Sequence, residues 1–288
     1  MSGTAKRPEE VSGKNSGGAR DAAVGAKRKK LALLGADVSD SESPQIHTFI
    51  LSQLGFSCDY ECVSAGADGV GEAVKRLLAE KDGFNVTVPY KKTVIPYLSG
   101  LSDTAKAFDS VNTVTAGRGY NTDGTGFLQM LAAAGIEPAG KRMLVLGAGG
   151  SGRSSAAALL SSGAQVWLYL RRAELLKEVC RSLGANRAED PEEGGYDLLV
   201  NCTGVGMHKT VGQSPVSGRA FFGCQAAVDL IYSPAESEFL RLARLAGKKT
   251  LNGHAMLFYQ AYDADCLYLG RTPDRTEADE LCRKYFLR

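Results

Sequence analysis

The sequence has no long apolar run and no paired-cysteine motif, and it carries little net charge. No window approaches 18 consecutive apolar residues, which excludes a membrane-spanning helix. The seven cysteines form no CxxC pair and the three histidines are scattered, so we expect reduced thiols and no metal site. With 34 Lys and Arg against 32 Asp and Glu, the chain lacks the basic excess of a nucleic-acid-binding surface. We therefore expect a cytoplasmic protein with neither a membrane nor a nucleic-acid partner.

The net charge of +2 is unevenly distributed along the chain. Residues 1–30 contain eight Lys or Arg and three acids, a balance of +5, so the rest of the chain carries −3. Residues 1–29 have too few apolar side chains to offset the entropy lost on ordering. We expect them to be a disordered basic tail without the apolar segment of a secretory signal. The alternative is a basic arm that binds nucleic acid or a membrane.

The first part of the body alternates between strand and helix patterns. Residues 31–35 form a short apolar run that ends in glycine, and residues 44–54 place apolar side chains at helical spacing behind a proline. Strand, helix and strand patterns follow at 56–62, 69–80 and 84–88. This β-α-β-α-β order predicts a mostly parallel sheet.

A hairpin then leads into a second alternating series. The hairpin is expected over residues 110–124, with its turn at Gly117–Gly119. From Arg142 onward the sequence reads as strand, Gly-rich turn, Ala-rich helix and strand. Further strands are expected at 197–203 and 226–232, and helical patterns close the chain.

The Gly-rich turn reads GAGGSG and lies between an apolar strand and a helix, which is the context of a dinucleotide-binding fingerprint. Small residues allow the backbone to approach a pyrophosphate, and the helix N-terminus supplies free N–H groups. The residues expected at the pyrophosphate are Gly147, Ala148, Gly149, Gly150 and Ser151. The alternative is a tight turn without a ligand.

The strand after this helix ends in Arg171 and Arg172, where an enzyme that binds NAD usually has an acid. Guanidinium groups suit the 2′-phosphate of NADP because they form charge-assisted hydrogen bonds with it. We therefore expect NADP as the cofactor and NAD as the less favoured alternative. Glu174 weakens this distinction, and solvated arginines without a ligand are the simpler interpretation.

These patterns predict an α/β protein with two domains. The first domain is expected over residues 30–123 and has a mostly parallel sheet. The second, over residues 124–252, is expected to be a Rossmann dinucleotide-binding domain. Because the second series already has its strands, we expect the helices of residues 253–288 to return to the first domain.

A polar cluster follows the apolar strand of residues 84–88. It includes Lys91, and ligands of parallel sheets lie at this end of the strands. Asp123 lies in the segment NTDG at the join between the two domains. A Lys and an Asp near a dinucleotide are a credible proton-transfer pair, in which the ammonium donates to a carbonyl that becomes an alkoxide and the carboxylate orients it. The spacing alone is weak support, since exposed Lys and Asp are common.

Together these motifs resemble the shikimate dehydrogenases and their quinate/shikimate dehydrogenase relatives. The matching segments, in chain order, are SESPxxH (41–47), NVTVPYK (85–91), VNT (111–113), NTDG (121–124), GAGGSG (147–152), NCTGVGM (201–207), DLIYSP (229–234) and NGHAMLFYQ (252–260). The resemblance implies a cleft between the two domains, with the substrate on the first and NADP on the second. It also implies reduction of 3-dehydroshikimate to shikimate by NADPH, a step of aromatic amino-acid biosynthesis through chorismate.

The resemblance implies roles for individual residues. Lys91 and Asp123 become the catalytic pair. Ser41 and Ser43 become the hydroxyl groups that hold the substrate carboxylate. The other substrate-binding residues that it implies are Thr87, Asn112, Tyr232 and Gln260. The further cofactor-binding residues that it implies are Leu230, Gly253 and Met256. An N-cap is the simpler interpretation of the serines, because Ser43 precedes a proline that opens a helix, and both roles can coexist.

Two features depart from the family pattern. Asp40 stands where the family has a histidine, and Asp40 and Glu42 bring negative charge to a site expected to bind a carboxylate. That charge weakens binding unless both side chains point to solvent. The second-domain motif reads Leu170-Arg171-Arg172, which leaves the cofactor preference open. The histidines are assigned no catalytic role, and His47 is expected to pack at the first helix.

Two other functions remain open from the sequence. One is a quinate/shikimate dehydrogenase that uses NAD or NADP. The other is a non-catalytic, ligand-sensing regulator on the same fold, which the altered serine loop and the basic tail favour and the intact Lys91 and Asp123 oppose. Either a monomer or a homodimer is compatible with the sequence.

Overall fold

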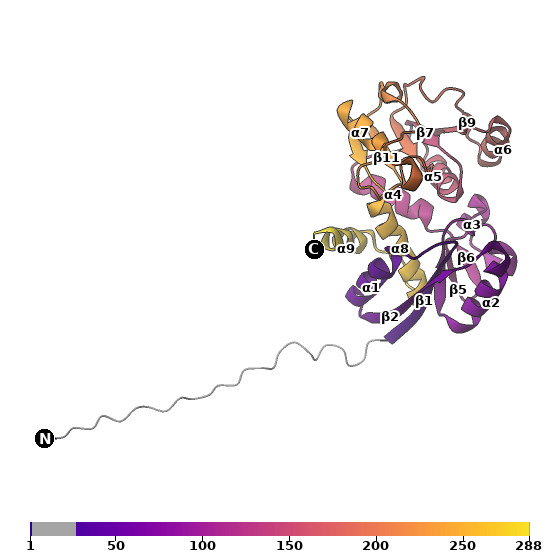
Figure 1. Ribbon diagram of the computed structural model, residues 1–288, viewed down its shortest axis with the longest axis vertical. Helices are drawn as coiled ribbons and strands as arrows, with labels where there is room; N and C mark the ends of the chain where they lie inside the picture. The colour runs from indigo at the N-terminus through magenta and orange to yellow at the C-terminus, as the bar shows by residue number, and fades with distance from the viewer. Residues whose placement is uncertain (2–26, 288) are drawn as a thin grey trace.

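The computed structural model describes residue 1 and residues 27–287 of the chain. It contains two α/β lobes, each built around one six-stranded sheet, and Figure 1 shows them one above the other. This arrangement confirms the expected fold class. The basic tail predicted for residues 1–29 lies outside the described residues at positions 2–26.

The sheet of the first lobe has the strand order β2-β1-β3-β5-β6-β4. Its strands are β1 (Lys27–Gly35), β2 (Phe56–Ser64), β3 (Gly83–Val86), β4 (Gly100–Leu101), β5 (Thr113–Thr115) and β6 (Arg118–Tyr120). Strand β1 pairs in parallel with β2 and β3, as the β-α-β-α-β pattern predicts, and the hairpin β5–β6 adds antiparallel strands. The helices of this lobe are α1 (Ser43–Gln53), α2 (Val70–Glu80) and α3 (Asp103–Phe108), with short 3₁₀ turns at Ala67–Gly69 and Ile95–Tyr97.

Strand β1 begins at Lys27, so the prediction that residues 27–29 belong to a disordered tail is wrong. Their backbone pairs with β2 from Lys27 opposite Phe56 onward. The cations also find partners: Arg28 forms an ion pair with Asp59, and Lys29 Nζ donates to the carbonyl oxygen of Tyr268 at 2.9 Å. Charged side chains on this strand therefore did not indicate disorder, because acceptors from distant segments lie beside them.

The hairpin turn is also displaced from its expected position. Thr115 pairs with Arg118, so the turn residues are Ala116 and Gly117 rather than Gly117–Gly119. Both turn residues have positive φ, of 49° and 73°. Two central residues with positive φ define the two-residue turn whose twist matches that of an antiparallel pair.

The sheet of the second lobe is fully parallel, with the order β12-β11-β10-β7-β8-β9. Its strands are β7 (Arg142–Leu146), β8 (Gln165–Tyr169), β9 (Asn186–Arg187), β10 (Leu198–Asn201), β11 (Ala226–Asp229) and β12 (Lys249–Leu251). Its helices are α5 (Gly150–Ser161), α6 (Ala173–Leu183) and α7 (Glu238–Leu245), with 3₁₀ turns at His208–Thr210 and Gly218–Phe221. The strand order reverses between β7 and β10, and ligands of open α/β sheets bind at such a switch point.

Two helices, α4 (Asp123–Ala133) and α8 (His254–Leu269), lie where the lobes meet, and α9 (Arg275–Phe286) ends the described chain. Helix α8 packs against α4, α1 and α9, while α4 also packs against α5 of the second lobe. The approach of α4 to α8 is close, because a Cβ atom built on Gly126 would lie 2.6 Å from the backbone nitrogen of Gln260. The last two helices therefore pack against α1 of the first lobe. We propose the domain division expected from the sequence, near residues 124 and 252, with α4 shared by both cores.

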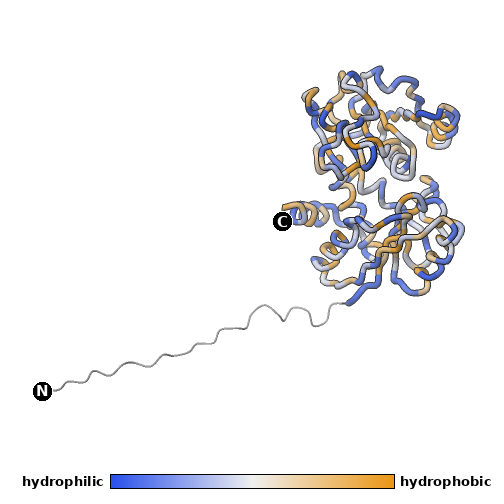
Figure 2. The backbone as a smooth tube through the Cα atoms, viewed as in Figure 1, coloured by the Kyte–Doolittle hydropathy of each residue, from blue (hydrophilic) through white to orange (hydrophobic). Residues whose placement is uncertain are grey.

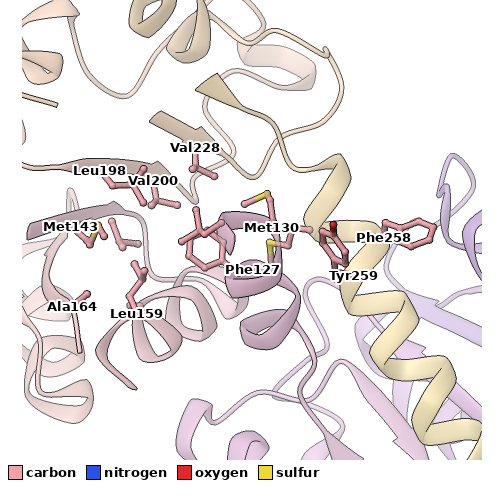
Figure 3. Close-up of a cluster of buried hydrophobic side chains, with 14 of the residues drawn as sticks. Phe127, Met130, Met143, Leu159, Ala164, Leu198, Val200, Val228, Phe258 and Tyr259 are labelled. Carbon is pink, nitrogen blue, oxygen red and sulfur yellow. The ribbon is translucent and has the colours of Figure 1, made fainter. Parts of the chain in front are cut away.

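The apolar cores follow the strand alternation and are continuous through α4. Ala32 and Leu34 of β1 face α2, while Leu31 faces the side covered by α1 and α8. In Figure 3, Phe127 and Met130 of α4 lie between strand residues of the second sheet and Phe258 of α8. Figure 2 colours the chain by hydropathy and shows apolar segments in the central strands and polar segments in the connecting loops. Within residues 27–287, no helix is both long and apolar enough to cross a membrane.

A buried hydrogen bond connects α1 with α8. His47 Nδ1 lies 2.7 Å from Asp265 Oδ1, and both side chains are fully buried. The ring of Tyr60 stacks on the His47 imidazole with 4.8 Å between the ring centroids. Burial raises the pKa of the Asp265 carboxyl, and His47 acts in the opposite direction. His47 therefore packs at the first helix, as expected, and holds α8 against it.

Candidate active site

The structure brings Lys91 and Asp123 together although 32 residues separate them. Lys91 lies in the turn after β3, and its carbonyl oxygen accepts a 2.7 Å hydrogen bond from the backbone N–H of Val111. Asp123 is the first residue of α4, where the helix N-terminus favours negative charge. Lys91 Nζ lies 2.5 Å from Asp123 Oδ2, and the two side chains are 11% and 6% exposed. Such a pair can donate a proton from the ammonium while the carboxylate fixes its position.

The second carboxylate oxygen of Asp123 is held by Asn112. Asn112 Nδ2 donates to Asp123 Oδ1 at 2.9 Å and to Gln260 Oε1 at 3.2 Å. The Asn112 side-chain carbonyl oxygen accepts from the backbone N–H of Thr122 at 2.8 Å. The pair and two of the expected substrate-binding residues therefore form one hydrogen-bond network. Both oxygens of Asp123 have a donor, so the direction of its carboxylate is fixed.

The serine loop leads into α1. The backbone N–H of Ser43 donates to Ser41 Oγ at 3.2 Å, and Ser43 is buried. The N-cap position of α1 belongs to Glu42, whose side chain makes no capping hydrogen bond. The interpretation of Ser43 as the N-cap is therefore wrong, because Ser43 is the first helical residue. Thr87, expected in the same site, follows β3, and its backbone N–H donates to the carbonyl oxygen of Leu34 in β1 at 2.9 Å.

Tyr232, His254 and Glu42 gather beside this loop from three different segments. Tyr232 follows β11, and its ring centroid lies 5.2 Å from that of His254, the first residue of α8. His254 Nε2 lies 3.3 Å from Glu42 Oε1. Burial raises the pKa of the Tyr232 hydroxyl, and the negative charge of Glu42 adds to this shift. No role was expected for His254 from the sequence, and its partner lies 212 residues away, so no local signal pointed to the contact.

The Gly-rich turn has the geometry of a phosphate-binding loop. Gly147 has a φ of +93°, and α5 starts two residues after Ala148, with Gly149 at its N-cap. A Cβ atom on Gly152 would lie 2.4 Å from the carbonyl oxygen of Gly147, so the turn requires glycine there. A Cβ atom on Gly149 would meet nothing within 4 Å, which leaves open space at the helix N-terminus. The donors and the space fit a pyrophosphate.

The start of α5 also lies against the Lys91 side chain. A Cβ atom on Gly150 would be 3.1 Å from Lys91 Cδ and 3.4 Å from Ser110 Oγ. The expected phosphate loop of the second lobe is thus adjacent to the proton-transfer pair of the first.

The remaining expected cofactor residues lie at the carboxyl ends of β8 and β11 and at the start of α8. Arg171 and Arg172 are exposed after β8, and Arg172 is the N-cap residue of α6. Gly253 lies against Leu230, because a Cβ atom on it would be 2.1 Å from the Leu230 carbonyl oxygen. Met256 is 7% exposed and belongs to the core cluster that α4 shares with the second sheet. The structure therefore brings Leu230 and Gly253 together and places the arginines on a separate strand end.

A buried cluster of polar side chains under the loops of the second lobe was not identified from the sequence. Asn201 Nδ2 donates to both carboxylate oxygens of Asp229 at 3.1 Å, and Ser237 Oγ donates to Asp229 Oδ2 at 2.5 Å. Burial raises the pKa of Asp229, while these donors act against the shift. Asn201 and Asp229 end two adjacent parallel strands, and that position in the segments NCT and DLI was the available signal.

Comparison with known proteins agrees with this geometry. Residues 33–114 match the family described as shikimate dehydrogenase substrate binding domain. A shikimate dehydrogenase (NADP(+)) of Thermus thermophilus is 36% identical over 88% of this chain and 98% of its own.

Two solved structures show how widely the fold is shared. A shikimate 5-dehydrogenase from Thermus thermophilus, in complex with NADP(H) and shikimate, superimposes with a TM-score of 0.82. Its sequence is 35% identical, and the match covers 89% of this chain and 99% of that one. The ligand-free 5-ketofructose reductase of a Gluconobacter strain has a TM-score of 0.76 at 28% identity, over 90% and 99% of the two chains. From its fold and its similarity to these relatives, this chain belongs to the shikimate dehydrogenase family.

Proposed function

We propose that this protein is an NADP-dependent shikimate dehydrogenase, which reversibly reduces 3-dehydroshikimate to shikimate on the route to chorismate and the aromatic amino acids. The observation that carries the proposal is the Lys91–Asp123 pair, 2.5 Å apart and adjacent to the glycine-rich start of α5. The family relationship supports the same reaction, since the Thermus thermophilus relative is a shikimate dehydrogenase (NADP(+)).

The proposed chemistry places Lys91 at the oxygen that changes its charge. NADPH, when bound, supplies the hydride. As the substrate carbonyl becomes an alkoxide, Lys91 Nζ stabilises the developing negative charge and donates a proton to it. Asp123 holds the ammonium through Oδ2, and Asn112 fixes the opposite oxygen of the same carboxylate. In the reverse direction Lys91 accepts the proton of the substrate hydroxyl.

The proposed substrate site surrounds this pair. Ser41 and Ser43 hold the substrate carboxylate through neutral hydroxyl groups, and Tyr232 borders the same end. Thr87, Asn112 and Gln260 bind the ring hydroxyl groups. Asn112 has three acceptors within 3.2 Å for its two N–H groups, so it can redirect one donor toward a ligand without leaving Asp123.

The decisive experiment follows the absorbance at 340 nm after shikimate and NADP are mixed with the purified full chain. We expect NADPH to form. Binding of shikimate without reduction of NADP would instead indicate the ligand-sensing regulator. Parallel rates with quinate and with NAD distinguish the quinate/shikimate alternative, in which turnover with quinate would be comparable to that with shikimate.

Replacing both Arg171 and Arg172 by alanine should raise the KM for NADP by about 100-fold, because charge-assisted hydrogen bonds to a phosphate are lost. The KM for NAD should change little, since NAD has no 2′-phosphate. Arg181→Ala, an exposed position later in α6, is the matched control and should leave both values unchanged. An equal rise in the KM for NADP and for NAD would show that the arginines do not bind the 2′-phosphate.

A cytoplasmic location and a monomeric or homodimeric state complete the proposal. All seven cysteines are free, which supports a reducing compartment. Among residues 27–287, no cluster of His, Cys, Asp or Glu is arranged to hold a metal ion.

A further inference from the structure

Glu42 places a negative charge beside the group of the protein that is proposed to hold a carboxylate. It lies between Ser41 and Ser43 at the start of α1, and its side chain is 34% exposed. A substrate carboxylate held by the two serines would meet a like charge if the Glu42 side chain turned toward it. Like charges close together oppose binding, so the direction of this side chain matters for affinity.

The structure shows what fixes that direction. His254 Nε2 lies 3.3 Å from Glu42 Oε1, within hydrogen-bond distance. The imidazole is itself packed between two rings, with centroid distances of 5.2 Å to Tyr232 and 5.8 Å to Phe286. His254 is also the first residue of α8, whose N-terminus favours a nearby anion. Glu42 therefore has a hydrogen-bond partner in the first residue of α8.

We propose that His254 is a positioning residue that holds the Glu42 carboxylate away from the substrate carboxylate, and that this contact sets the preference for acidic over uncharged substrates. The inference rests on the proposed function, because it concerns the carboxylate end of that substrate site. The contact does not need a charged imidazole, since a neutral ring with its proton on Nε2 donates the same hydrogen bond.

Proteins of this fold must differ in whether they prefer an acidic or an uncharged substrate. The Gluconobacter relative is named as a reductase of 5-ketofructose, which carries no carboxylate. The shared architecture thus serves both acidic and uncharged substrates, and side chains at the carboxylate end must make the distinction. Asp37 and Asp40, the other acids of the loop, are exposed, so Glu42 is the partly buried charge that needs a partner here.

The test compares four variants of the full chain. His254→Phe keeps an aromatic ring between Tyr232 and Phe286 but removes the donor, whereas His254→Gln keeps a donor. Glu42→Gln removes the charge, and the double variant His254→Phe/Glu42→Gln removes both partners. For each variant we would measure kcat, the KM for shikimate and for NADP, and the inhibition constant of methyl shikimate, which lacks the negative charge.

We expect His254→Phe to raise the KM for shikimate by about 10-fold, because Glu42 is then free to turn toward the substrate carboxylate. Its kcat, its KM for NADP and its affinity for methyl shikimate should stay near those of the unmodified protein. The KM values for shikimate of His254→Gln and Glu42→Gln should lie within about 2-fold of that of the unmodified protein. The first variant keeps the hydrogen bond, and the second removes the charge. The double variant should recover the original KM, which a purely structural role of His254 would not produce.

An unchanged KM for shikimate in His254→Phe would overturn the inference, and so would a double variant that stays as weak as His254→Phe. Should His254→Phe fail to fold, His254→Asn tests the same contact, because its side chain is too short to reach Glu42. Failure of the proposed function is distinguishable, since the unmodified protein would then not oxidise shikimate at all.

Discussion

Replacing Lys91 by alanine is expected to lower kcat by about 1,000-fold or more, because the reaction loses both its proton donor and the positive charge at the developing alkoxide. The Lys91 ammonium lies 2.5 Å from Asp123 Oδ2 and its side chain is 11% exposed, so water does not readily replace it. The affinity for NADP should be retained, since the Gly-rich turn belongs to the other lobe. Steady-state rates and a titration of NADPH fluorescence measure the two quantities separately.

Lys92→Ala is the matched control for this experiment. Lys92 is the next residue, but its side chain is 74% exposed and forms a surface ion pair with Asp109. Exposed pairs contribute little, so kcat and stability should be nearly unchanged. Near-normal turnover of Lys91→Ala would refute the assignment of the proton donor, whatever the control shows.

Replacing Gly152 by alanine should abolish measurable NADP binding and destabilise the second lobe. The added Cβ would lie 2.4 Å from the Gly147 carbonyl oxygen and 3.2 Å from Cys202 Cβ, so the backbone of the turn must move. Overpacking of this kind costs about 1–3 kcal/mol, which corresponds to a fall in Tm of roughly 2–5 °C for a protein of this size. The Tm from circular dichroism and the Kd for NADP are the measurements.

Gly149→Ala separates cofactor binding from stability. Its Cβ would meet nothing within 4 Å, and the φ of −68° suits any residue, so the Tm should not change. The new methyl group would occupy the space proposed for the pyrophosphate, so the affinity for NADP should still fall. Normal NADP binding by both variants would place the cofactor elsewhere.

Much of the fold could be predicted from the sequence because the strand and helix periods were clear. The parallel β1–β3 unit and the Rossmann-type sheet are as expected. The start of β1 was missed because partners of its cations lie far away in sequence, at Asp59 and Tyr268. The position of the hairpin turn was predicted wrongly because Ala116 adopts a positive φ, which is uncommon for alanine.

The candidate site shows the same limit. The segments that carry Lys91 and Asp123 could be named from their motifs, and the fold brings them into contact. The sequence raised the problem of negative charge at Glu42 but could not show where that charge points. The answer depends on His254, 212 residues away, and on the packing of α8 against the first lobe.

The return of α8 to the first sheet has a consequence for how the protein is made. The face of that sheet carrying Leu31, together with Leu51 of α1, is covered by Ala264 and Tyr268 of α8. During synthesis on a ribosome, the strands of the first sheet emerge early, whereas α8, which covers this face, emerges only after the strands of the second sheet. The second sheet spans one uninterrupted stretch from β7 to β12, so all of its strands are made before α8. The Leu31 face of the sheet that is synthesised first is thus covered only when α8 has been made, and it is accessible to chaperones until α8 leaves the exit tunnel.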